Sequence, residues 1–219
     1  MVDLIRDLSA ERVRRNLDCV RERIADAGRD PDDVEILAAV KYLPVDELEA
    51  LAQGGITHVG ENRAQELVAK AEAMPGRFTW DFIGQLQSRK VRDLVGRVRY
   101  IHSVASESAL AQLARHGTSE TRVMIEVNVA GEAGKGGIDP AALPAFLARC
   151  PVEVVGLMTM PPLAPDPEHN RPHFAALRAL ADEHRLRHLS MGTSQDYPVA
   201  VQEGATIVRL GTILYASAS

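Results

Sequence analysis

Cysteine is scarce in this 219-residue sequence. The only two, Cys19 and Cys150, lie far apart and fit no CxxC or other metal-ligand spacing. This excludes a disulfide-stapled secreted scaffold and a zinc-cysteine site, and it is typical of a reduced, cytoplasmic compartment.

Long apolar runs and an excess of positive charge are missing as well. Charged residues such as Arg6, Asp7 and Glu11 interrupt every apolar run near the N-terminus, and no segment reaches the length of a membrane span. The formal net charge is -5, which argues against nucleic-acid binding driven by the overall field. We therefore expect a cytoplasmic protein with neither a membrane nor a nucleic acid as partner.

One basic cluster is an exception to the negative net charge, and it is formed by Arg89-Lys90-Val91-Arg92 together with Arg97 and Arg99. Such a run favours a solvated helix face, with an anion or partner site as the alternative.

Familiar catalytic motifs are absent, including GxSxG and HExxH. The segment Gly131–Gly137 resembles a Walker loop, but Val129 stands where its first glycine would be and Gly136 replaces the Ser or Thr. We interpret the segment as a flexible lid carrying Lys135. His169 and His173 have i, i+4 spacing, yet a proline lies between them, so we expect no metal site.

Eight short apolar segments recur along the chain, each separated from the next by a helical pattern. The predicted strands are Ile36–Lys41, Thr57–Glu61, Phe78–Gly84, Tyr100–Ser103, Val123–Asn128, Val152–Met158, His188–Gly192 and Thr206–Gly211. This alternation predicts an α/β fold, a single (β/α)8 TIM barrel spanning residues 1–219 with no second β domain. A helix from Asp3 to Ala27 is expected to cover the barrel where the usual final helix is absent or vestigial.

The first of these strands ends abruptly in Lys41, after the apolar run from Val34 to Val40. The carboxyl ends of barrel strands are where this fold keeps its chemistry. A lysine buried there is poised as the neutral amine that condenses with an aldehyde. The alternative, favoured by the run alone, is a lysine that snorkels to the surface.

The other strand ends are rich in groups that bind an anion. Ser190–Ser194 follows the seventh strand and Gly211-Thr212 follows the eighth, where this fold commonly holds a phosphate through hydroxyls and free backbone N–H groups. A strand-tip lysine together with a phosphate cradle is what pyridoxal 5'-phosphate requires.

Several motifs in order carry a resemblance to a known family: Lys41, GEN at 60–62, FIGQLQSRK at 82–90, KGG at 135–137, GLMTM at 156–160, LSMGTSQD at 189–196 and VRLGT at 208–212. From Ile36 to Tyr215 the chain resembles the pyridoxal phosphate homeostasis protein family. Members of this family look like the barrel domain of alanine racemase standing alone.

The resemblance implies that pyridoxal phosphate is held as an aldimine with Lys41, and that Ser190, Gly211 and Thr212 meet its phosphate. It further implies that Arg209 faces the pyridine nitrogen and that Asn62 and Met158 line the ring. An arginine stays protonated, so it leaves the ring nitrogen unprotonated and weakens the ring as an electron sink.

The chain departs from the family pattern at four positions. The family usually has His in place of Asp81, Asn in place of Arg89, Ser in place of Val40 and often a second lysine in place of Leu43. The last change weakens the case for an auxiliary cofactor site at that position and leaves the aldimine untouched.

The function we expect is a carrier and buffer of pyridoxal phosphate that delivers the cofactor to apo-enzymes without turnover of its own. A pyridoxal-phosphate-dependent amino-acid racemase is the alternative, but it needs a second base, which alanine racemase takes from a domain missing here. A lysine Schiff-base aldolase acting on a sugar phosphate is a third interpretation, and Arg209 and the family resemblance count against it.

Overall fold

The structure is a computed structural model that describes residues 4–217. In this part of the chain eight parallel strands follow one another around a closed barrel, and β1 pairs with β8 to complete the ring. The strands are β1 (Glu35–Ala39), β2 (His58–Glu61), β3 (Thr79–Phe82), β4 (Tyr100–Val104), β5 (Arg122–Glu126), β6 (Glu153–Met158), β7 (His188–Thr193) and β8 (Ile207–Leu210). The predicted (β/α)8 barrel is thereby confirmed, and no second domain is evident in these residues.

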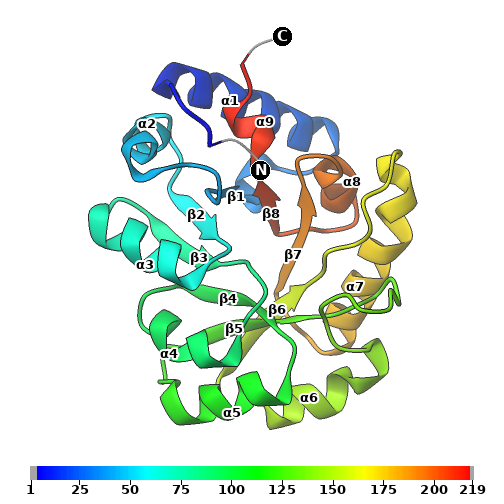
Figure 1. The fold of residues 1–219 in the computed structure, drawn as a ribbon. Helices are drawn as coiled ribbons and strands as arrows, with labels where there is room; N and C mark the ends of the chain where they lie inside the picture. Colours follow the sequence, from blue (N-terminus) through cyan, green and yellow to red (C-terminus); the bar gives the residue numbers. More distant parts are fainter. Residues whose placement is uncertain (1–3, 218–219) are drawn as a thin grey trace.

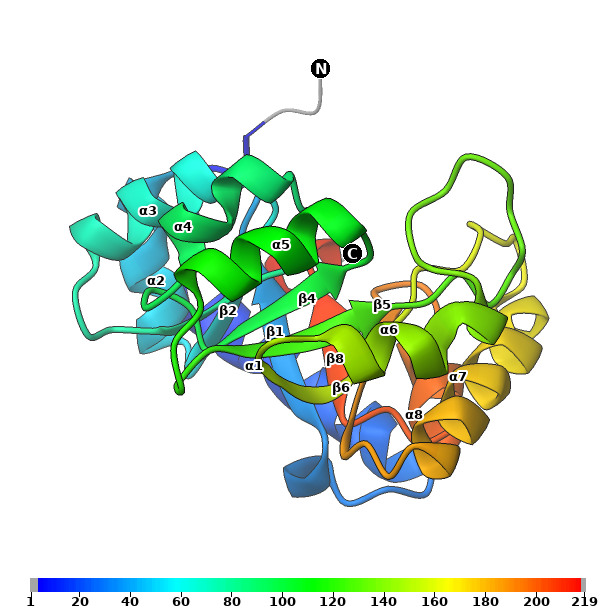
Figure 2. The ribbon, with the colours of Figure 1, turned by 90° about the horizontal axis from the view of Figure 1, so that it is seen from below.

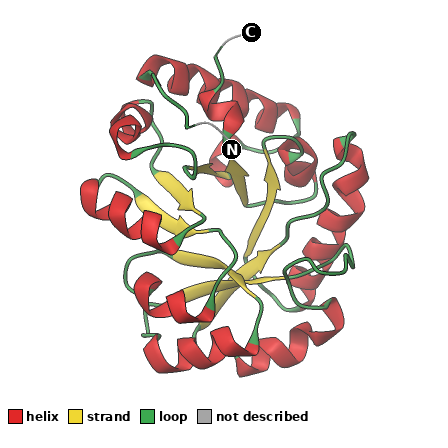
Figure 3. Ribbon diagram, in the orientation of Figure 1, coloured by secondary structure: helices red, strands yellow, loops and turns green. Residues whose placement is uncertain are grey.

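Helices surround the strands (Figures 1 and 3). They are α1 (Ala10–Asp26), α2 (Leu48–Gln53), α3 (Ala64–Ala73), α4 (Val91–Leu94), α5 (Glu107–His116), α6 (Leu143–Arg149), α7 (Arg171–Glu183), α8 (Tyr197–Gln202) and α9 (Thr212–Tyr215). Short 3-10 turns supplement them: η1 (Pro31–Asp33), η2 (Val45–Glu47), η3 (Ser88–Lys90), η4 (Pro140–Ala142) and η5 (Pro167–Asn170). No helix within residues 4–217 has the length and apolar character needed to cross a membrane.

Two apolar layers stabilise the barrel, because side chains of a strand alternate between its two faces. Leu37 of β1 lies inside the barrel with Met124, Met158 and Ile207. Its neighbour Ala38 belongs to the larger cluster between the strands and the helices. With both faces covered, the strands read as continuous apolar runs in the sequence.

Helix α1 begins later than the sequence predicted. The expected start at Asp3 lies outside the described residues, and within them the helix begins at Ala10, because the Ser9 side chain caps it by accepting a hydrogen bond from the Arg12 N–H. Asp7, with a φ of 56°, turns the chain just before this cap.

Helix α1 covers the barrel where α9 is only one turn long, as predicted. Its Asn16 amide donates hydrogen bonds of 3.1 and 3.0 Å to the carbonyls of Leu214 and Ala216. Figure 1 shows α1 lying across α9 at the top of the barrel. The two ends of the fold therefore close against each other.

Candidate functional site

A cavity of about 250 Å3 opens at the carboxyl ends of the strands. Five of the seven residues predicted from the sequence line it: Lys41, Asn62, Arg209, Gly211 and Thr212. These residues come from the ends of β1, β2 and β8, so closure of the barrel brings them together. The cavity therefore unites a primary amine, a guanidinium and a stretch of accessible backbone.

Lys41 lies two residues past the end of β1, in a turn, and its side chain is exposed. Its Nζ lies 4.7 Å from the centroid of the Tyr42 ring, within the range of a cation–π contact. The amine therefore stands at the mouth of the cavity and not in the buried position that one of the two sequence interpretations required. A ligand entering from solvent can reach it.

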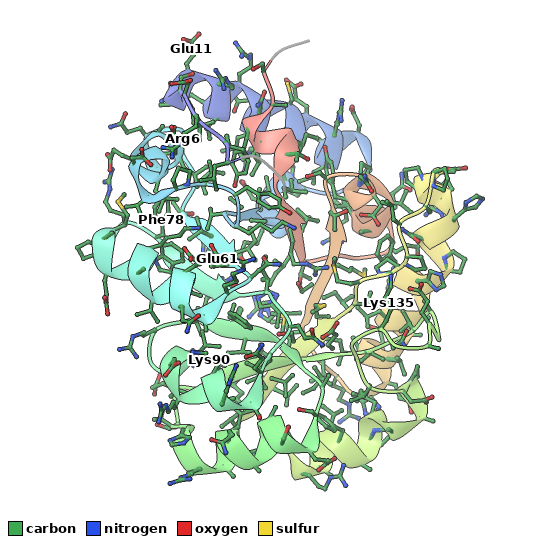
Figure 4. All side chains as sticks on the ribbon, in the orientation of Figure 1. Arg6, Glu11, Glu61, Phe78, Lys90 and Lys135 are labelled. Atoms are coloured by element: carbon green, nitrogen blue, oxygen red, sulfur yellow. The ribbon has the colours of Figure 1, made fainter. Side chains whose placement is uncertain are left out.

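A buried ion pair fixes the backbone next to Lys41. Lys70 Nζ lies 2.5 Å from Glu61 Oε2 and donates a hydrogen bond of 2.7 Å to the carbonyl of Val40. The other carboxylate oxygen of Glu61 accepts from the backbone N–H of Asn62 at 2.6 Å. Figure 4 labels Glu61 beside α3, the helix that carries Lys70. The Lys70–Glu61 pair thus fixes the backbone directly before Lys41 and at Asn62.

Tyr215 holds the same strand end from the opposite side. Its hydroxyl donates a hydrogen bond of 3.1 Å to the carbonyl of Ala39. Burial, and secondarily the charge of Glu61, raises the pKa of Tyr215 far above its ordinary value. The phenol therefore stays protonated and acts as a hydrogen-bond donor.

Arg209 is buried beneath the cavity and is held by hydrogen bonds from both terminal nitrogens. Nη1 donates to the carbonyl and the hydroxyl of Ser190, each at 2.6 Å, and Nη2 donates to the carbonyl of Thr159 and to Met160 Sδ, each at 2.9 Å. Among the described residues no acceptor receives the Nε–H. This nitrogen remains free to donate to a ligand in the cavity that Arg209 lines.

Burial lowers the pKa of Arg209 to about 10, although the charges of Asp196 and Glu126 act in the opposite direction. The guanidinium is therefore still protonated at neutral pH. The pKa of Glu126 is raised by burial, against the influence of Arg209.

A hydrogen-bonded chain runs from Arg209 into the barrel interior. Ser190 Oγ lies 2.8 Å from His102 Nδ1, and His102 Nε2 lies 3.1 Å from Asp81 Oδ2. Burial raises the pKa of Asp81, but hydrogen bonds and charges from His102 and Arg99 outweigh burial and lower it overall. The tautomer of His102 that carries its proton on Nε2 donates to the Asp81 carboxylate and accepts from the Ser190 hydroxyl at Nδ1.

This Ser190–His102–Asp81 arrangement resembles a nucleophilic triad, but its geometry serves another purpose. All three side chains are fully buried, and the serine oxygen already accepts a hydrogen bond from Arg209. A substrate has no access to such a serine. The chain of hydrogen bonds instead fixes the orientation of the guanidinium.

The network continues to the opposite end of the barrel. Arg99 donates to both carboxylate oxygens of Asp81, at 3.0 and 2.5 Å, and to both oxygens of Glu35 at 2.5 Å. The members of this network lie on different strands, so their spacing in the sequence does not predict that they meet. The available signal was a polar residue with a large side chain within a strand that is otherwise mostly apolar, such as His102 in β4.

Two of the predicted residues, Met158 and Ser190, do not line the cavity. Met158 packs inside the barrel, and Ser190 lies beneath Arg209, because both strand positions face the barrel interior. Met160 and Ser194 line the cavity wall instead, and the Gly211 N–H donates to Ser194 Oγ at 3.1 Å. The predicted ligand contacts of Met158 and Ser190 stay predictions.

The loop from Gly131 to Gly137 projects from the barrel (Figure 2). The Asn128 side chain holds its base, donating to the Glu132 carbonyl at 2.9 Å and accepting from the Glu132 N–H at 3.2 Å. Lys135 Nζ pairs with the Glu132 carboxylate at 3.0 Å. The lid role of this loop stays a prediction.

Within residues 4–217 no group of three or more His, Cys, Asp or Glu side chains is placed to hold a metal ion. The site is that of a (β/α)8-barrel protein in which an accessible lysine, a buried arginine and the Gly211-Thr212 segment face one cavity. The family described as alanine racemase, N-terminal domain, matches residues 8–219. The chain belongs to the pyridoxal phosphate homeostasis protein family, as the following relatives show.

The chain is 39% identical to the pyridoxal phosphate homeostasis protein of Aquifex aeolicus, covering 94% of this chain and 97% of that one. The corresponding protein of Pseudomonas aeruginosa is 35% identical, with 94% of each chain covered. Among solved structures, PipY of Synechococcus elongatus with pyridoxal phosphate bound has a TM-score of 0.76 and 34% identity, covering 90% of this chain and all of PipY (100%). Alanine racemase of Corynebacterium glutamicum shares the fold, with a TM-score of 0.72 at 16% identity, and this chain covers 64% of it.

Proposed function

We propose that this chain binds pyridoxal 5'-phosphate in the cavity at the strand ends, with Lys41 as the covalent anchor, and acts as a carrier and buffer of the cofactor. The observation that carries the proposal is the convergence of Lys41, Arg209 and the Gly211-Thr212 backbone on one cavity. The names of the relatives and the cofactor bound in PipY support it.

The donors around the cavity fit the three polar ends of the cofactor. When bound, pyridoxal phosphate supplies an aldehyde with which a lysine amine condenses, forming a C=N bond and releasing one water. Lys41 is placed to provide that amine. The free Nε–H of Arg209 suits the ring nitrogen, which is an acceptor, and a protonated guanidinium keeps that nitrogen without a proton.

In this proposal the segment after β8 binds the phosphate of the cofactor. A Cβ built on Gly211 would meet nothing closer than Ala39 at 3.8 Å, so the glycine leaves space for a ligand beside the backbone. The hydroxyls of Thr212 and Ser194 lie on the same wall. Backbone N–H groups and hydroxyls are suitable donors to a phosphate.

The state of Tyr215 supports storage of the cofactor over racemisation. A two-base racemase needs a proton-transfer group on each face of its substrate. The phenol of Tyr215 lines the cavity, but it donates to Ala39, and burial raises its pKa, so it is a poor base.

Borohydride reduction after incubation with pyridoxal phosphate tests the proposal. Peptide mapping is expected to place the pyridoxyl group on Lys41, and Lys41→Ala is expected to lose the label. The matched control is Lys135→Ala, which removes another exposed lysine. A label on a different lysine, or no uptake of cofactor, would overturn the site assignment.

The carrier role has its own test. The loaded protein is expected to reconstitute an apo-transaminase, and L-alanine incubated with the loaded protein is expected to take up no deuterium at its α-carbon at enzymatic rates. Steady deuterium uptake would favour the racemase instead.

A further inference from the structure

A second and larger hollow lies beside the cavity, between the start of α3, the segment from Gln85 through α4, and the end of α5. Its volume is about 780 Å3. Figures 1 and 2 agree that α3, α4 and α5 lie side by side on one flank of the barrel. We call this hollow the basic groove, because the charged residues that line it are Arg63, Arg89, Lys90, Arg92, Arg115 and one carboxylate, Asp93.

The positive charge of the basic groove is largely unopposed. Asp93 lies near two cations already, 3.3 Å from Lys90 Nζ and 3.5 Å from Arg92 Nε. Among the described residues no carboxylate lies within ion-pair distance of Arg63, Arg89 or Arg115. A surplus of four positive charges therefore gathers on one flank of a chain whose net charge is -5. Such a concentration favours an anionic ligand.

The start of α3 adds neutral donors to the same wall. The helix has ten residues, its N-cap is Arg63, and no side chain caps it. Its first residues, Ala64 and Gln65, line the basic groove. The backbone N–H groups of an uncapped first turn and the positive end of the helix dipole both favour an anion here.

The remaining lining residues select a polar ligand. Four glutamines, Gln65, Gln85, Gln87 and Gln112, line the basic groove, and each amide both donates and accepts hydrogen bonds. Phe82 is the large apolar side chain of the lining, and it is buried in the core. A ligand with hydroxyl groups or a heterocyclic ring can form hydrogen bonds with these amides, whereas an apolar ligand cannot.

We propose that the basic groove is a binding site for a small organic polyphosphate of the nucleoside di- or triphosphate kind. The surplus charge matches two or three linked phosphates, and arginines bind phosphate through two parallel N–H donors. A long nucleic acid is disfavoured, because the net charge of the chain is negative and would repel the strand beyond the groove.

The groove and the cavity are separate but adjacent. Asn62 lines both, whereas Lys41 lines only the cavity and Arg89 only the groove. The inference therefore goes beyond cofactor binding and does not rest on Lys41.

Isothermal titration of the full chain with ATP, and separately with inorganic triphosphate, tests the proposal. The variants Arg89→Glu and Arg115→Glu are expected to weaken binding by roughly tenfold or more, since each loses charge-assisted hydrogen bonds. Lys135→Glu is the matched control: it makes the same change of charge on the opposite side of the barrel (Figure 4), and the affinity should stay within about twofold. Circular dichroism checks that each variant is folded.

The outcomes separate this site from the cofactor cavity. Lys41→Ala is expected to bind ATP as the parent chain does. Loss of ATP binding in Lys41→Ala would place the anion in the cavity and overturn the proposal, as would equal weakening by Lys135→Glu or no binding at all. A twelve-nucleotide oligothymidylate that binds more tightly than ATP, and loses its affinity in the same variants, would identify the ligand as nucleic acid instead.

Discussion

The ammonium group of Lys70 donates a hydrogen bond to the carbonyl of Val40, the residue directly before Lys41. Lys70 is 4% exposed and its partner Glu61 is 1% exposed. A buried ion pair is retained only when its hydrogen bonds are well satisfied, and here the backbone on both sides of the cavity satisfies them. The pair therefore links the stability of the fold to the position of the reactive amine.

Replacement of Lys70 by Met leaves the Glu61 carboxylate buried without a counter-ion. We expect a loss of about 3–5 kcal/mol in the free energy of unfolding, measured by urea denaturation. Arg77→Met is the control, because Arg77 and Glu49 form an ion pair of the same 2.5 Å length that is about half exposed. That change should cost no more than about 1 kcal/mol. Equal losses in the two variants would contradict a structural role for the buried pair.

Acid should destabilise the protein partly through Asp81, whose pKa lies below its ordinary value in the fold. A carboxyl group with a lower pKa in the folded state contributes stability that is present above its unfolded pKa, roughly 3.9, and lost as pH falls through the folded value. The stability gap between the parent chain and Asp81→Asn should therefore narrow below about pH 4. Urea unfolding at several pH values measures it, with the exposed Asp46→Asn as control. A gap that stays constant with pH would count against the prediction.

His102 should affect the cofactor site without touching the ligand. Removing its ring in His102→Ala takes away a hydrogen-bond partner of the Ser190 hydroxyl, which itself accepts from Arg209, so the guanidinium should be held less firmly. We expect faster release of bound pyridoxal phosphate and a shifted absorbance of the loaded protein. His102→Gln, which keeps a donor for Asp81, should recover part of both. A spectrum unchanged in His102→Ala would show that Arg209 is held without the imidazole.

Gly84 tests how tightly β3 packs against the residue that follows β2. A Cβ at this position would lie 1.9 Å from the carbonyl oxygen of Asn62, which is backbone and has little freedom to move. Gly84→Ala should therefore lose about 1–3 kcal/mol of stability by overpacking and should bind the cofactor less tightly, because Asn62 is displaced. For unfolding alone, Gly211→Ala is the comparison: it meets only an ordinary contact, and a change within about 0.5 kcal/mol is expected.

The sequence predicts the barrel well because each strand is an apolar run bounded by turn residues and the helices between them are striped. It also finds the ends of β1, β2 and β8, since a lysine, an asparagine and a glycine interrupt those runs. It cannot tell which side of a fully buried strand faces the barrel axis, because both sides are apolar. The expected ligand contacts of Met158 and Ser190 therefore rest on the family resemblance alone, and both side chains lie on the inner face of the barrel.

Contacts between residues on distant strands are even harder to predict from a single sequence. His102 and Ser190 are 88 positions apart, and nothing in their spacing predicts that they meet. The basic cluster shows the same limit. Arg89 and Arg92 line the groove, whereas Arg99 turns into the barrel to pair with Asp81 and Glu35, although all three belong to one charged stretch.

The contact between α1 and the segment after β8 constrains how the chain is made. The Asn16 amide donates to carbonyls 198 and 200 positions further on, so this contact can form only after residue 216 has left the ribosome. Until then the apolar stripe of α1 (Val13, Val20 and Ile24) lacks part of its cover. The segment after β8 thus completes the shielding of α1, and synthesis that stops before residue 216 leaves part of this apolar stripe exposed to other chains.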